Sequence, residues 1–115
     1  MSEWLLKATK QFERDMKHMD KRYPRETAQM RSNLKHYLDV LSTHDNPLLM
    51  VQIPFVHRES SGCHAITQQP LSSAAQTRLY VYCFIQDHEV YLICAGDKQT
   101  QPKDNKFCKQ FVEQF

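Results

Sequence analysis

A predicted β-hairpin near the C-terminus carries the residue types that bind and cleave RNA. Arg78 stands at the start of its first strand, and Lys98 follows its second strand. Both side chains bind phosphate, and fixed positive charge stabilises a phosphate as it gains negative charge during cleavage. Tyr80 and Tyr82 alternate along the first strand, so their rings project from one side and could stack on unpaired bases. The hairpin therefore predicts an RNA-binding surface.

The same aromatic face has a second interpretation, because rings on a sheet are often covered by another element. The C-terminal segment holds Phe107, Phe111 and Phe115 and could supply a covering helix. A helix over one end of the face would leave the Arg78 end as a cleft. Both interpretations are open from the sequence.

Two histidines in the middle of the chain are candidates for proton transfer. His57 and His64 bracket a polar stretch in which Arg58 could contact RNA. Imidazole titrates near neutral pH, so either ring can act as general acid or base; a solvated role is the alternative. These histidines and Cys63 lack the paired spacing of a zinc site, so we expect no metal and no other cofactor. A thiol nucleophile at Cys63 is a further alternative.

Two predicted helices come before these residues. Residues 4–6 indicate a short strand, and Thr9 can cap a helix whose apolar residues recur at helical spacing. Lys10 and Lys17 lie mostly off the apolar stripe, so this helix offers RNA phosphates a basic face, or a merely solvated one. A second helix is expected over residues 25–42, after a proline that suits a first helical turn. The tight connection predicts an antiparallel helix hairpin.

The later half of the chain is predicted to be mainly β-structure. Periodicity is weak over residues 46–61, where we expect a loop, and residues 63–71 indicate a weak strand. Residues 77–86 and 89–96 are β-branched and aromatic runs around a two-residue turn, the pattern of an antiparallel hairpin.

The register of that hairpin decides which residues share a face. Pairing Gln86 with Glu89 places Arg78 opposite Asp97. One face is then aliphatic and thiol-bearing and should pack on the helix hairpin: Leu79, Val81, Cys83, Ile85, Val90, Leu92 and Cys94. We thus expect an α+β fold, with an N-terminal helix hairpin on a small, mainly antiparallel sheet and a C-terminal helix capped by Asp104.

Composition fits one globular domain. The 115 residues are 41% hydrophobic and 24% charged, with a formal net charge of +2, so we expect a single domain over residues 1–115 rather than a polybasic binder. No apolar run approaches the roughly 20 residues of a membrane-spanning helix, and no secretory signal precedes residue 30. A cytoplasmic protein with four reduced cysteines is expected. Phosphate-binding glycine loops and nucleophile elbows are missing, which disfavours NTPases and hydrolases.

The order of these elements and one motif resemble the RelE/ParE toxin superfamily, closest to the HigB-like, phage Gp49-like addiction-module killer proteins. In that branch the last strand ends in a glycine, a lysine and a Thr/Ser-Gln step before an Asp-led helix. The matching residues here are Gly96, Lys98, Thr100, Gln101 and Asp104. The element order resembles the family over nearly the whole chain, and the residue-level match covers residues 78–108. Residues 64–67 depart from the Glu, apolar, Arg stretch that the family often has in its second strand.

The resemblance implies a fold like that of the microbial ribonucleases, and a toxin that a cognate antitoxin protein neutralises. Most such toxins cleave messenger RNA on the ribosome, so ribosome and mRNA are the expected partners. In that role Arg78 and Lys98 would stabilise the phosphate attacked by a ribose 2′-hydroxyl, and His57 or His64 would transfer protons. Two alternatives are a ParE-like inhibitor of DNA gyrase and a non-toxic phage or mobile-element regulator with the same fold.

Overall fold

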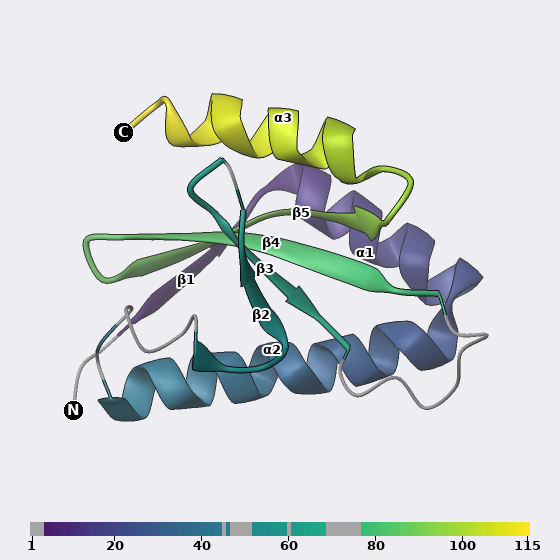
Figure 1. Cartoon of the computed structure of the whole chain (residues 1–115), viewed down its shortest axis with the longest axis horizontal. Helices are drawn as coiled ribbons and strands as arrows, with labels where there is room; N and C mark the ends of the chain where they lie inside the picture. The colour runs from purple at the N-terminus through teal and green to yellow at the C-terminus, as the bar shows by residue number, and fades with distance from the viewer. Residues whose placement is uncertain (1–3, 45, 47–51, 60, 69–76) are drawn as a thin grey trace.

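The computed structural model describes residues 4–44, 46, 52–59, 61–68 and 77–115, in which three helices surround a five-stranded sheet (Figure 1). The strand order is β1-β5-β4-β3-β2, and every neighbouring pair is antiparallel except β1 and β5. In chain order the elements are β1 (Leu5–Ala8), α1 (Lys10–Arg22), α2 (Pro24–His44), β2 (Val56–Arg58), β3 (His64–Thr67), β4 (Leu79–Gln86), β5 (Glu89–Asp97) and α3 (Gln101–Val112). The predicted α+β fold is confirmed. None of the helices in the described residues has the length and hydrophobicity to cross a bilayer.

The chain enters the fold through a strand and a capped helix, as the sequence predicts. Thr9 follows β1, and its Oγ1 accepts a hydrogen bond from the Phe12 N–H at 3.0 Å. The same hydroxyl donates to the Ile93 carbonyl at 2.5 Å. The first bond satisfies a free N–H at the start of α1, and the second fixes that start to β5. Pro24 opens α2, where its missing N–H costs no helical bond.

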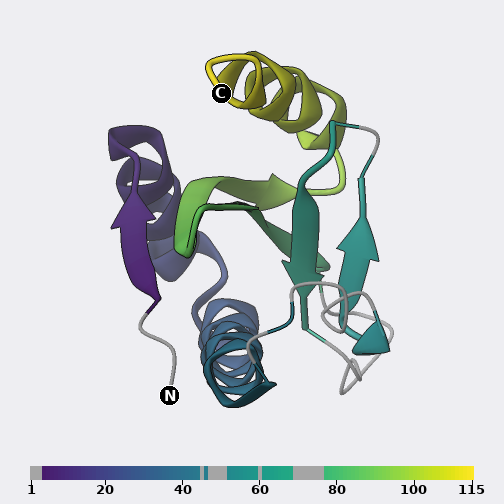
Figure 2. The ribbon, with the colours of Figure 1, turned by 90° about the vertical axis from the view of Figure 1, so that its left-hand side faces the viewer.

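α1 and α2 cover one face of the sheet and close an apolar core with it (Figure 2). Met30, Tyr37 and Leu41 of α2 are fully buried there. The strand residues of this core are Val56, Ile66, Leu79, Val81, Cys83, Val90, Leu92 and Ala95. Apolar burial is the main favourable contribution to folding. The predicted packing of the aliphatic hairpin face on the helix hairpin is confirmed for all its members but one.

The exception is Cys94, which a β-bulge moves to the other face. Pairing next to the hairpin turn is as predicted, and Cys83 faces Leu92. The next pair is Tyr82 with Cys94, which leaves Ile93 as an extra residue in β5. A bulge shifts the register by one and so reverses the direction of the side chains beyond it. The prediction that Cys94 lies on the aliphatic face is therefore wrong.

α3 covers the opposite, aromatic face of the sheet (Figure 2). The buried residues of this second cluster are Cys63, Ala65, Tyr80, Tyr82, Ile93, Cys94 and Cys108. The covering interpretation of the aromatic face is thus confirmed for both tyrosines of β4. The residue that caps α3 is Thr100, so the prediction that Asp104 caps it is wrong. Asp104 lies in the first turn of the helix and is buried.

β2 and β3 complete the sheet at the edge opposite β1. β2 lies inside the segment that the sequence predicted as loop; of that segment, residues 47–51 and 60 lie outside the described residues. β3 confirms the weak strand predicted over residues 63–71, of which 69–71 also lie outside. In the connection between them, Glu59 accepts hydrogen bonds from the side chains of Gln101 and Asn105, both at 3.1 Å. This connection is therefore fixed to the start of α3.

Candidate functional site

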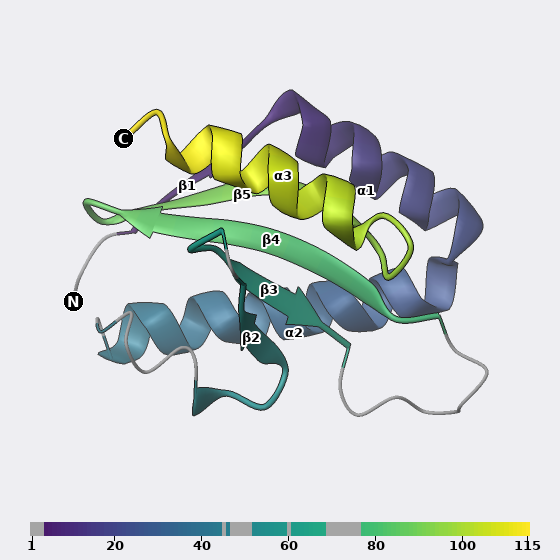
Figure 3. The same cartoon turned by 45° about the horizontal axis from the view of Figure 1, so that its top comes forward.

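Two adjoining cavities form a cleft where β4 begins and β5 ends. The outer cavity, of about 600 Å³, is lined by residues that include Arg22, Tyr23, Arg78, Tyr80, Asp97 and Lys98. The inner cavity, of about 350 Å³, lies between α1, α3 and the end of β5. Figure 3 shows α1 and α3 on neighbouring sides of β5. Arg22, Tyr23, Asp97 and Gln99 line both cavities, so the two are parts of one cleft.

Positive charge reaches the outer cavity from three separate segments. Arg78 precedes β4, Lys98 follows β5, and Arg22 ends α1. The hairpin brings the first two together, as predicted, although Leu79 rather than Arg78 pairs with Asp97 because of the bulge. Sequence reasoning missed Arg22. Only the packing of α1 on β5 places it at the cavity, and no local pattern signals that contact.

The two tyrosines of the aromatic face differ in access. Tyr80 is 8% exposed and lines the outer cavity, whereas Tyr82 is fully buried under α3. The stacking role predicted for Tyr82 is wrong in this structure, because its ring has no exposed face. Tyr23, which the sequence did not single out, also lines the outer cavity, and the Arg22 guanidinium lies 5.3 Å from its ring centroid. A cation over a ring orients both groups.

Asp97 is the carboxylate that lines the outer cavity. Its Oδ1 accepts hydrogen bonds from the backbone N–H of Gln99 at 2.9 Å and of Thr100 at 3.1 Å. These bonds hold the side chain in the turn that leads to α3. The carboxylate is thus fixed beside Lys98 and Arg78 while still lining the cavity.

The inner cavity is lined by carboxylates held in defined positions. Asp15 of α1 accepts hydrogen bonds from the Ala95 N–H at 3.1 Å and from the Gln11 amide at 2.8 Å. Asp104 of α3 is 7% exposed and accepts a hydrogen bond from the Thr100 hydroxyl at 2.7 Å. Each carboxylate has acceptor capacity beyond these bonds, because an ionised carboxylate offers about four lone-pair sites.

The chemistry of Asp104 is shaped by its surroundings. Burial raises the pKa of this carboxyl to about 6, against the effect of the Thr100 hydrogen bond. The nearby charges of Asp15 and Asp97 raise it further, and Lys103 lowers it. Asp104 comes this deep only because Gly96 has no side chain: a Cβ there would collide with the oxygens of Thr100 and Asp104. The glycine of the Gly-Lys-Thr-Gln motif therefore has a packing reason in this fold.

His64 lies away from the cleft. It pairs with Cys83, five residues along the hairpin strand from Arg78, a span of about 16 Å. Its Nδ1 is 3.0 Å from the hydroxyl of Tyr37, so the ring lies on the face that α2 covers. Burial, and then the charge of Arg58, lower the pKa of His64 and favour its neutral form.

The remaining predicted site residues also line neither cavity. His57 is half-buried in β2, and Arg58 is exposed at the end of that strand. Lys10 and Lys17 are exposed on α1. The structure therefore brings together Arg78, Lys98 and Tyr80 of the predicted set, and not the two histidines. Lys103, which lines the inner cavity, was missed by the sequence reasoning.

All four cysteines are buried and unpaired. A hydrogen bond with Cys108, together with burial, raises the pKa of Cys63. A buried thiol with a raised pKa is a poor nucleophile, which argues against the thiol alternative. In the described part of the chain, no group of three or more His, Cys, Asp or Glu side chains could hold a metal ion.

The chain matches no protein-family model, no curated protein and no solved structure.

Proposed function

We propose that the protein is an endoribonuclease whose reaction takes place in the outer cavity. The observation that carries this proposal is the convergence of Arg22, Arg78 and Lys98 beside Tyr23 and Tyr80. Guanidinium and ammonium groups bind phosphate oxygens, and aromatic rings stack on unpaired bases. Single-stranded RNA presents both groups at once, whereas a duplex keeps its base faces stacked.

The proposed reaction is attack by a ribose 2′-hydroxyl on the adjacent phosphate. A bond forms between the 2′-oxygen and phosphorus, the bond from phosphorus to the next 5′-oxygen breaks, and a 2′,3′-cyclic phosphate results. The departing 5′-oxygen takes a proton from water and becomes a 5′-hydroxyl. Arg78 and Lys98 stabilise the negative charge that the phosphate gains on the way. Asp97, fixed in the same cavity, is assigned to accept the 2′-hydroxyl proton. His57 and His64 have no part in this assignment, because neither lines the cavity.

Ribosome-bound messenger RNA is the proposed substrate, and the cytoplasm the proposed location. The support is the Gly-Lys-Thr-Gln-Asp pattern that begins at the end of β5, which resembles that of the addiction-module toxins, and the exposed Lys10 and Lys17 of α1. Exposed lysines attract RNA phosphates in a salt-dependent way. A cognate antitoxin protein is the proposed neutralising partner.

The test is a reconstituted translation reaction with one defined mRNA, with and without ribosomes, in which primer extension maps new 5′ ends. We expect cuts only on ribosome-bound message. Arg78→Ala and Lys98→Ala should each slow cutting by at least about 100-fold, because each removes charge from the site of bond cleavage. Asp97→Asn should also slow it, since asparagine keeps an acceptor for the two N–H groups but cannot take a proton.

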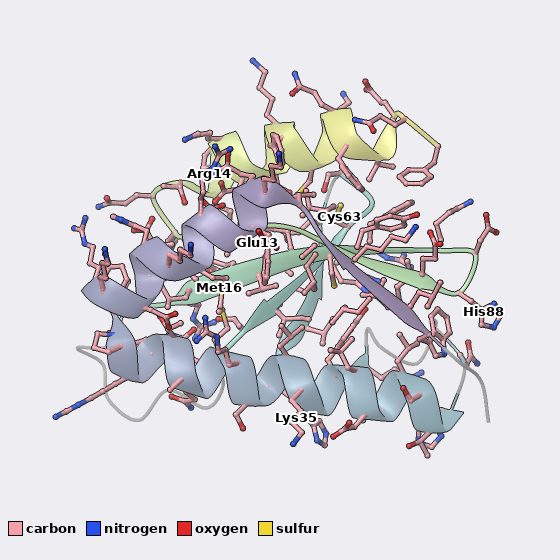
Figure 4. All side chains as sticks on the ribbon, turned by 180° about the vertical axis from the view of Figure 1, so that it is seen from behind. Glu13, Arg14, Met16, Lys35, Cys63 and His88 are labelled. Carbon is pink, nitrogen blue, oxygen red and sulfur yellow. The ribbon has the colours of Figure 1, made fainter. Side chains whose placement is uncertain are left out.

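The matched control is Lys35→Ala. Lys35 projects from the outer side of α2, away from the cleft (Figure 4). This variant loses the same charge as Lys98→Ala and should cut at the normal rate. Intact message under all conditions would reject the endoribonuclease, and a measurement of gyrase supercoiling would then test the ParE-like alternative.

A further inference from the structure

The inner cavity is a site that the proposed cleavage reaction does not use. Its volume of about 350 Å³ lies within the range of roughly 300–1,000 Å³ for small-molecule sites. It opens into the outer cavity along the shared residues Arg22, Tyr23 and Asp97. A nucleotide whose phosphate lies in the outer cavity can therefore place its base in the inner one.

One wall of the inner cavity suits the flat face of a base. Phe107 of α3 lines it and is 37% exposed, although a phenylalanine is normally buried. Met19 of α1 lines it as well and is buried in the core beneath. An exposed aromatic ring beside a cavity offers base stacking, which stabilises binding without selecting among the four bases.

The polar groups of the cavity, in contrast, can discriminate among the four bases. Asp104 and Asp15 line it as hydrogen-bond acceptors fixed by Thr100, Ala95 and Gln11. An ionised carboxylate needs donors, and its two oxygens match two parallel N–H groups. Among the RNA bases only guanine presents two adjacent donors, N1–H and N2–H, on its Watson–Crick edge. Adenine and cytosine pair one donor with an acceptor there, and uracil places its single donor between two acceptors.

We propose that the inner cavity is a guanine-binding subsite, in which Asp104 accepts from N1–H and N2–H while the base stacks on Phe107. The subsite rests on the proposed function for its place next to the cleaved phosphate. Asp15, held by Ala95 and Gln11, shapes the adjacent wall. The protein then prefers RNA with guanine at the cleavage site.

The test is calorimetric titration of the intact protein with 3′-GMP, 3′-AMP, 3′-CMP and 3′-UMP. We expect 3′-GMP to bind about tenfold more tightly than the other three, or better. Asp104→Asn should bring its affinity down to that of 3′-AMP, since an amide cannot accept from both donors. Phe107→Ala should weaken the binding of all four nucleotides and leave the order of their affinities unchanged. Asp39→Asn, a change of the same charge on the exposed surface of α2, should alter none of them.

Equal affinities for the four nucleotides would overturn the subsite, and so would a guanine preference that survives Asp104→Asn. Thermal unfolding of Asp104→Asn checks that α3 is intact, and Phe107→Ala tests the cavity independently of that residue. The two proposals fail separately. Guanine-selective binding without any cut message rejects the ribonuclease and keeps the subsite, whereas cut message with equal nucleotide affinities rejects the subsite alone.

Discussion

The two faces of the sheet differ in kind, although the same strands supply both. The face under α1 and α2 is an apolar core, and the hydroxyl of its buried Tyr37 lies 3.0 Å from a ring nitrogen of His64. The face under α3 contains three thiols, the carboxylate of Asp104, and Tyr82, whose buried hydroxyl has no hydrogen-bond partner among the described residues. The charged cleft opens where this second face meets α1 at the end of β5. The Nε1 of Trp4, which packs against the first core, is likewise buried without a partner among the described residues, so the two faces differ in their polar content rather than in how completely it is hydrogen-bonded.

The main apolar core and the candidate site lie on opposite sides of the sheet, except that Met19 of α1 belongs to the core and also lines the inner cavity. If the proposed function holds, changes under α2 should affect unfolding and leave the reaction alone. Changes under α3 and in the cleft should affect pH dependence, binding and cleavage with small costs in stability.

The largest expected effect on stability is at Leu41, which is fully buried under the sheet. Leu41→Ala should lower the free energy of unfolding by about 2–5 kcal/mol, because it removes apolar contacts and leaves a cavity. Leu5→Ala is the matched control. Leu5 is 59% exposed in β1, so this substitution should lower the free energy of unfolding only slightly. Urea denaturation measures both. Equal costs for the two variants would show that the α2 face is not the main core.

The sequence anticipates the α2 face better than the α3 face, for physical reasons. Helical spacing and β-alternation both report which residues turn inward, so this core could be predicted from local patterns. The bulge at Ile93 could not, because one inserted residue leaves no mark in the sequence yet reverses Cys94. The glycine-free turn was also hard to read; it is made by Asp87 and His88 with φ of 49° and 61°.

The same limit applies to the candidate site. Arg78 and Lys98 could be predicted together because they end paired strands. Arg22 reaches the cleft through the packing of α1 on β5, which spacing does not report. His64 was assigned from its residue type and its place beside a polar stretch, whereas the direction of its side chain follows from a strand pairing that the sequence only weakly signals.

A moderate effect is expected at Asp104, whose pKa rises from 3.8 to about 6 on folding. The folded protein therefore binds this proton more tightly, so this group favours folding below about pH 4, and its contribution falls as pH rises to about 6. Asp104→Asn cannot ionise and so avoids the loss of stability that ionisation of the buried carboxyl causes. It should raise the free energy of unfolding at pH 7.5 by about 1 kcal/mol, a small gain because solvent partly screens the charge. Asparagine can still accept from Thr100.

Urea denaturation at pH 4, 5, 6 and 7.5 checks this expectation. The stability of Asp104→Asn relative to the natural protein should increase over that range, whereas Asp39→Asn should show no such trend. Parallel pH profiles for the natural protein and Asp104→Asn would contradict a strained carboxylate on the α3 face.

The smallest expected effect separates the two buried tyrosines. Tyr37→Phe should lower the free energy of unfolding by about 1 kcal/mol, because it removes the hydrogen bond between the Tyr37 hydroxyl and Nδ1 of His64. Tyr82→Phe should leave it unchanged or raise it slightly, because the lost hydroxyl has no partner among the described residues. Thermal unfolding of the two variants, side by side, gives the comparison. Equal losses of stability would mean that the Tyr82 hydroxyl is hydrogen-bonded in solution, and the difference between the two tyrosines would be wrong.

The most direct test is an NMR titration of ¹⁵N-labelled protein with a single-stranded RNA that carries a 2′-O-methyl group on every ribose, which removes the attacking hydroxyl and keeps the RNA backbone. The account predicts saturable shifts at the backbone amides of Arg22, Arg78, Asp97 and Lys98, and none along the outer side of α2 around Lys35. Shifts that are absent, or that appear only outside the cleft, would contradict the assignment of RNA to this end of the sheet.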